Sequence, residues 1–135
     1  MPPTRIPQYE SVLNEKASTG VGTAFQVSDF KNIQLELFTS GNANLTVKIQ
    51  GSLRGPNNQP DFSIAASSTN RWDYLAVWDL NPSTLIPGST GIAVTGTDIV
   101  KNLLVNVDGI VWLNCVVTAH AAGTVSANAV VYNNW

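Results

Sequence analysis

The sequence predicts an all-β domain: an antiparallel, jelly-roll-like β-sandwich of about eight strands with an extended N-terminal arm. Apolar and polar residues alternate along 33–37 and 45–49, which is the period of a half-buried strand. Clusters of Gly, Pro and Asn separate such segments at short intervals, and a helical pattern is almost absent. Short strands joined by turns of this kind are typical of sandwiches and barrels.

The first half of the chain contains a predicted hairpin and a long loop. Residues 40–44, Ser-Gly-Asn-Ala-Asn, have the composition and length of a turn between the strands on either side. Residues 53–70 are rich in Gly, Pro, Asn and Ser, which predicts a long connection of the kind that often carries contacts. A strand rich in aromatic residues is then expected over 72–80, and a short strand over 92–94.

The strongest local turn signal is the pair Asp108-Gly109. Segments rich in β-forming residues precede and follow it, and Asp-Gly suits a two-residue type I′ turn. A second turn is expected at Ala121-Ala122-Gly123. The last third of the chain is therefore predicted to form a three-stranded meander.

Two parts are predicted along the chain, an N-terminal arm over 1–22 and a single β-sandwich domain over 23–135. Prolines oppose regular hydrogen bonding at the start of the arm. Its apolar residues exceed what a solvated tail needs, and the terminal Trp also favours docking on this chain or on a neighbour. The candidate contacts with other subunits are Pro2, Pro3, Ile6, Tyr9, Val12, Leu13 and Trp135.

Composition narrows the class of function. Charged residues make up 12% of the 135 residues, about half the usual fraction, which predicts a surface covered in the working state by other subunits, such as a homo-oligomer. The net charge of -2 leaves no basic stripe, so nucleic acid is not the expected partner. No signal segment or membrane-spanning run is evident, and the single cysteine implies no oxidising compartment.

No catalytic or metal site is predicted, and we expect no enzyme activity and no cofactor. The one histidine, His120, lies five residues from Cys115 in a strand, so the two side chains are expected on opposite faces unless a bulge intervenes. Asp98 and Asp108 stand in loops, where Asp ordinarily caps turns. The sequence shows no residues arranged for catalysis by paired carboxylates or by a nucleophile and a base.

The aromatic residues Trp72, Tyr74 and Trp78 share one face of the predicted strand over 72–80. Facing outward, they would form a stacking platform for sugar rings or an anchor for a partner protein. Facing inward, they would belong to the core. The sequence leaves both interpretations open.

Three stretches resemble small virion structural proteins of tailed bacteriophages, a group that includes capsid decoration or cement proteins. They are Trp-Asp-Tyr-Leu-Ala-Val-Trp-Asp-Leu over 72–80, Ile-Pro-Gly-Ser-Thr-Gly-Ile over 86–92, and Val-Asn-Val-Asp-Gly-Ile-Val-Trp over 105–112. The resemblance implies a β-rich, often trimeric protein with an N-terminal arm. It also implies binding to major capsid protein subunits on the outside of the virion, after assembly in the cytoplasm of the host bacterium.

Two other functions remain open at this level. One is a carbohydrate- or receptor-binding β-sandwich module that uses Trp72, Tyr74 or Trp78 as stacking rings. The other is a structural component of the phage tail or baseplate, which would use the same fold and the same kind of contacts.

Overall fold

The computed structural model describes residues 7–132, and these residues form strands, turns and loops without a helix. No membrane-spanning helix is therefore found in this range. The prediction of an all-β protein is confirmed, with ten strands in the described range. They are β1 (Pro7–Lys16), β2 (Gly20–Val21), β3 (Phe25–Gln26), β4 (Asn32–Ser52), β5 (Asp73–Leu75), β6 (Val77–Asp79), β7 (Thr84–Ile86), β8 (Ile92–Thr97), β9 (Val100–Asn106) and β10 (Trp112–Tyr132).

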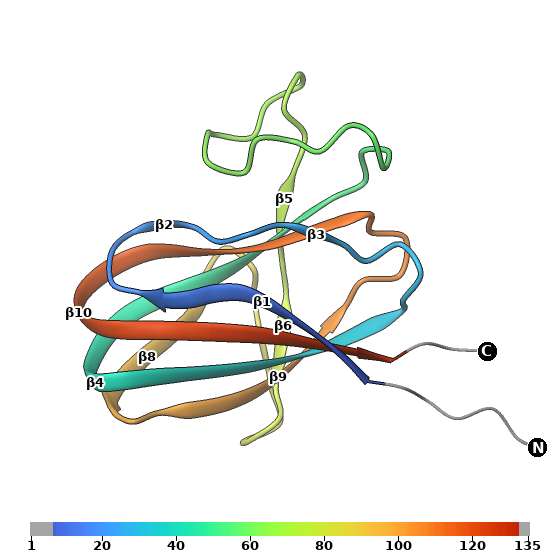
Figure 1. The fold of residues 1–135 in the computed structure, drawn as a ribbon. Helices are drawn as coiled ribbons and strands as arrows, with labels where there is room; N and C mark the ends of the chain where they lie inside the picture. Colours follow the sequence, from blue (N-terminus) through green and yellow to red (C-terminus); the bar gives the residue numbers. More distant parts are fainter. Residues whose placement is uncertain (1–6, 133–135) are drawn as a thin grey trace, which may run out of the picture.

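Two long antiparallel strands, β4 and β10, form the centre of the sheet and pair with each other from one end to the other. Both bend where the sequence predicted a hairpin turn, and Figure 1 shows the two bends at the same side of the molecule. Gly41 and Gly123 supply the left-handed backbone, with φ of 73° and 83°. The two predicted hairpins are therefore wrong: each glycine bends a strand that keeps the same pairing partner on both sides.

All ten strands belong to one antiparallel sheet. Its main path is β1-β10-β4-β9-β6-β7, while β2 and β3 pair with β10, and β5 and β8 pair with β4. The Asp108-Gly109 turn is present, and Ile110 N donates to Val107 O at 2.8 Å. It does not close a hairpin, because β9 and β10 lie on opposite sides of β4, so the predicted meander is also wrong.

The bends fold the sheet over, so that its two halves face each other across one core (Figure 1). The first half contains residues 32–39 of β4, and the second half contains residues 42–52. Inward positions follow the strand period of two. In β4 they are Ile33, Leu35, Leu37, Ala43, Leu45, Val47 and Ile49, all buried. The sheet is continuous and not closed, and the predicted jelly-roll sandwich is not confirmed.

Much of the predicted arm is an ordered part of the sheet. Residues 7–16 form β1, which pairs with β10 along the register from Gln8↔Val131 to Lys16↔Val125, with irregularities after Ser11 and Leu13. Val12 and Leu13, at 2% and 1% exposed, are core residues of this chain. They cannot supply the contacts with other subunits that the sequence suggested.

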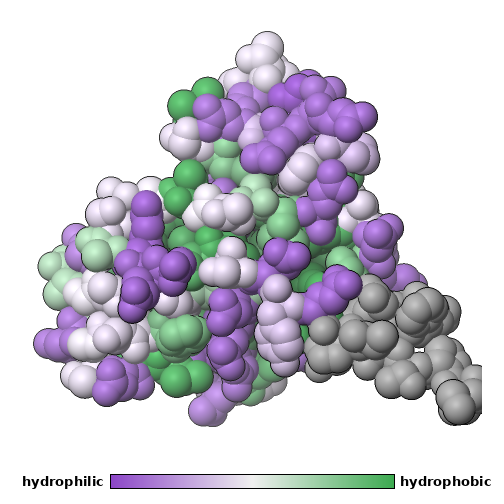
Figure 2. All heavy atoms as spheres, in the orientation of Figure 1, coloured by the Kyte–Doolittle hydropathy of each residue, from purple (hydrophilic) through white to green (hydrophobic). Residues whose placement is uncertain are grey.

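The long loop predicted over 53–70 lies within the connection 53–72, which forms a lobe that rises from the second half of the sheet (Figure 1). In Figure 2 the lobe carries mostly hydrophilic residues, and hydrophobic residues show between it and the rest of the molecule. The chain then returns through β5 and β6. These short strands pair with different halves, β5 with β4 at residues 49–51 and β6 with β9, so the predicted aromatic strand is in fact two.

Candidate functional site

A row of six side chains crosses the first half of the sheet on the side that faces away from the core. The register aligns them strand by strand: Tyr9 opposite Val130, Val130 opposite Gln34, and Gln34 opposite Leu104. Leu104 is in turn opposite Trp78, and Trp78 is opposite Leu85. Directly opposed residues lie about 4.5–5.5 Å apart, so this is a continuous row in which five of the six side chains are largely apolar.

Other exposed apolar side chains lie on the same side of this half of the sheet. Phe38 and Val100 form another cross-strand pair on the same side, and Leu80 follows β6 with its N–H bonded to Asn102 O. Trp78 is 43% exposed and Leu85 is 48% exposed. We call this surface the apolar face; its members are Tyr9, Phe38, Trp78, Leu80, Leu85, Val100, Leu104 and Val130.

The apolar face carries little charge, although a polar row of Asn128, Glu36 and Asn102 separates its six-residue row from Phe38 and Val100. Along the outward positions of β4, β9 and β6 in this half, Glu36 is the single charged residue within the described range. The nearest ion pair, Lys101 Nζ to Asp79 Oδ2 at 3.1 Å, involves inward positions at the edge of the core. An apolar surface with so few solvated groups favours burial against another protein.

Of the contacts predicted from the sequence, Tyr9 lies on the apolar face and is 70% exposed. Pro2, Pro3, Ile6 and Trp135 lie outside the described residues. Apart from Trp78, the other members of the apolar face were not predicted as contacts, although the sequence carries a signal for Leu104 and Val130. In Leu103-Leu104-Val105, and likewise in Val130-Val131, consecutive apolar residues must point to both faces of a strand.

The three aromatic residues considered as a platform do not form one. Trp72 and Tyr74 are half-buried and meet edge to face, with ring centres 5.1 Å apart and planes at 78°. The Trp72 ring also contacts Phe62, and its Nε1 donates to Ile64 O at 3.1 Å. Trp78 lies in β6 on the apolar face, paired with the other half of the sheet. The outward-facing interpretation therefore holds for Trp78, which is exposed. Trp72 and Tyr74 mainly pack against their neighbours.

A bulge in β10 changes the predicted relation of Cys115 and His120. The register shifts between Val117 and Ala119, so that His120 stands opposite Leu45 on the face where Cys115 stands opposite Ile49. Four residues along β4 still separate the two positions by about 13 Å. His120 Nε2 lies 2.7 Å from Gly123 O. Cys115 is buried in the core, and this burial raises its pKa to about 12.

The acidic residues stay apart in the structure. Asp98 and Asp108 lie in separate connections, Asp98 between β8 and β9 with a φ of 52°, and Asp108 before Gly109. Among residues 7–132 no group of three or more His, Cys, Asp or Glu side chains is placed to hold a metal ion.

Residues 7–132 define a class of fold: one folded antiparallel sheet without a helix. A solved structure of this class is the crystal structure of SPBc2 prophage-derived protein YomS, which covers 98% of this chain with 98% of its own length, at a TM-score of 0.70 and 12% sequence identity. The likeness is therefore one of fold. No family model and no curated protein matches the sequence.

Proposed function

We propose that this protein is a non-enzymatic structural protein of a bacteriophage particle, which binds and stabilises an assembled capsid as a decoration or cement protein. The apolar face carries this proposal, because it offers a neighbouring subunit a wide, weakly charged surface with a half-exposed tryptophan near one end of its central row. Tryptophan and tyrosine are the usual anchors of protein interfaces. The prophage origin of the structural neighbour supports the phage assignment.

In this proposal the partner is a major capsid protein subunit, and the chain acts on the exterior of the virion as a homotrimer. Contacts repeated by symmetry over a shell add up, so each can be modest while the particle as a whole is stabilised strongly. A carbohydrate-binding function has less support, because Trp72 and Tyr74 pack edge to face and Trp78 stands apart from them.

The proposal is tested by co-sedimentation of the purified chain with capsids of the phage that encodes it. The double variant Trp78→Ser/Leu85→Ser removes two neighbouring exposed side chains of the apolar face. We expect its binding to weaken more than about tenfold, as for loss of an interface anchor. Ile64→Ser is the matched control, since Ile64 is 56% exposed in the lobe, outside the apolar face.

Unchanged capsid binding by the double variant would reject the apolar face as the contact surface. Immunogold labelling separates the alternatives of location: label on the head supports a decoration protein, and label confined to the tail or baseplate rejects it. Light scattering tests the homotrimer independently, and a monomeric mass at working concentration would contradict it.

A further inference from the structure

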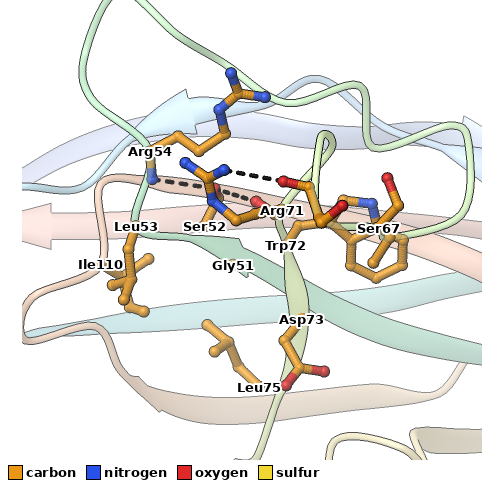
Figure 3. Close-up of a pocket in the computed structure, with 12 residues that line it drawn as sticks. Gly51, Ser52, Leu53, Arg54, Ser67, Arg71, Trp72, Asp73, Leu75 and Ile110 are labelled. Carbon is orange, nitrogen blue, oxygen red and sulfur yellow. Dashed lines mark hydrogen bonds between the residues drawn. The ribbon is translucent and has the colours of Figure 1, made fainter.

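A cavity of about 710 Å³ lies beneath the lobe, next to the second half of the sheet. Trp78 and the apolar face belong to the first half. The end of β4 and β5 form one side, the lobe forms another, and Ile110 from the turn before β10 also lines it (Figure 3). This volume lies within the range of small-molecule sites, about 300–1,000 Å³. Nothing in the proposed capsid function uses it.

One side of the cavity is apolar. Leu53, Leu75, Ile110 and Trp72 line it, and Figure 3 shows Leu75 below the end of β4. Leu53 is 72% exposed, although it directly follows the buried Ser52. These side chains give an apolar ligand a surface that the described chain leaves open.

The lobe side of the cavity is cationic. Arg54 Nη1 donates to Thr69 O at 3.3 Å, and Arg71 Nη1 donates to Ser68 O at 3.0 Å. Each guanidinium has five N–H donors, so most remain available. Within residues 7–132 neither arginine has a carboxylate at ion-pair distance. Asp73 also lines the cavity, and its Oδ1 accepts from Tyr74 N, so the lining holds two positive charges and one negative charge.

The two arginines are held in place by the chain around them. Ser52 Oγ donates to Arg71 O at 2.6 Å and accepts from Arg54 N at 3.2 Å, which ties both residues to the end of β4. Asn70, only 8% exposed, holds the lobe from within: its Oδ1 accepts from Asp61 N and its Nδ2 donates to Asp61 O, both at 2.8 Å. A site ordered before binding loses less entropy when a ligand enters.

We propose that this cavity binds an organic anion with a flat or apolar body and one carboxylate. The body packs against Leu53, Leu75, Ile110 and Trp72, and the carboxylate accepts hydrogen bonds from Arg54 and Arg71. Guanidinium groups match the geometry of a carboxylate and can bind it through two parallel hydrogen bonds. The apolar wall disfavours ligands that are polar throughout, such as most sugars.

The test uses a pair of probes of equal shape, naphthalene-2-carboxylate and its neutral amide, measured by titration calorimetry at neutral pH. We expect the carboxylate to bind about tenfold or more tightly than the amide, because hydrogen bonds to charged groups are stronger than neutral ones. Arg54→Gln and Arg71→Gln should each weaken carboxylate binding by about tenfold and leave amide binding unchanged. Lys31→Gln, an exposed charge that does not line the cavity, is the matched control.

Equal binding of the two probes, binding that does not depend on either arginine, or no binding at millimolar concentration would each overturn the proposal. A second pair distinguishes the source of the carboxylate: a short peptide ending in phenylalanine, as the free acid and as the C-terminal amide. Tighter, arginine-dependent binding of the peptide acid supports a protein terminus as the ligand, and tighter binding of the naphthoate supports a small molecule. Circular dichroism of each variant verifies that the fold is intact.

Discussion

The two halves of the β4–β10 pair present different surfaces away from the core, although the same two strands form both. In the second half, Gln50 is outward in the strand alternation yet only 1% exposed, and its Nε2 donates to Phe62 O of the lobe at 2.9 Å. Lys48, two residues earlier, lies with its Nζ 4.8 Å from the ring centre of Tyr74. The chain's own lobe therefore covers the end of this half around Gln50, while Asn42 and Asn44 nearer the bend stay exposed.

The first half has no such cover within the described residues. Its outward positions carry Leu104, Trp78 and Val130, which no other described segment buries completely. Exposed apolar side chains contribute little to the stability of an isolated chain, because an apolar side chain stabilises the folded state only when it is buried. The chain's own lobe thus covers part of the second half of the sheet, whereas the apolar face of the first half stays exposed within residues 7–132.

The largest expected effect is the difference in stability loss between substitutions on the inward and outward faces of β9. Leu103→Ala should lower the free energy of unfolding by about 2–5 kcal/mol, because Leu103 is fully buried and the change leaves a cavity. Leu104→Ala, at the neighbouring outward position, should cost under about 1 kcal/mol. Urea unfolding measures both. Equal losses would show that the apolar face is part of this chain's own core.

The second effect concerns the bends that divide the two halves. Gly123→Ala should destabilise the protein by more than about 2 kcal/mol, because the residue has a left-handed backbone and a Cβ there would lie 2.7 Å from Ala43 Cα. Gly41→Ala is the matched control: its φ is 73°, but a Cβ would meet nothing within 4 Å. Gly41→Ala should lower the free energy of unfolding by about 1–2 kcal/mol, the cost of placing an alanine in the left-handed conformation. Thermal unfolding of both variants measures the difference.

The third effect is the pH dependence of stability that follows from burial of Cys115 in the core between the two halves. Burial raises the pKa of Cys115 to about 12, so the unfolded thiol ionises at lower pH than the folded one. The stabilisation is complete below the ordinary thiol pKa of 9.0 and is lost as the pH rises from there toward 12. The stability that Cys115→Ala loses, relative to wild type, should therefore be smaller at alkaline pH than at pH 7. A pH-independent difference in urea unfolding would contradict this.

The smallest effect lies on the covered half. Lys48→Met removes the ammonium group over the Tyr74 ring and should cost about 0.5–1 kcal/mol, the size of a partly exposed cation–π contact. Lys31→Met, at an exposed position before β4, is the control for loss of one positive charge. A loss no larger than that of Lys31→Met would mean that Lys48 contributes nothing to this surface.

The sequence determined the all-β class, a long loop over 53–70 and the alternation of β4 at 33–37 and 45–49, because alternation and turn composition are local properties. It failed at 40–44 and 121–123, where turn-forming residues bend strands that remain paired with each other. Whether a glycine reverses a strand or bends it depends on which strand lies alongside, and this pairing is set by contacts distant in sequence.

The apolar face was likewise predicted only in part. Sequence supplied Tyr9 and Trp78, and it supplied the apolar runs that contain Leu104 and Val130. Only the tertiary structure aligned these four residues in one row, buried Val12 and Leu13, and separated Trp78 from Tyr74. The reason is physical: a strand's alternation fixes which residues share a face, whereas the register between strands distant in sequence decides which of those faces become one surface.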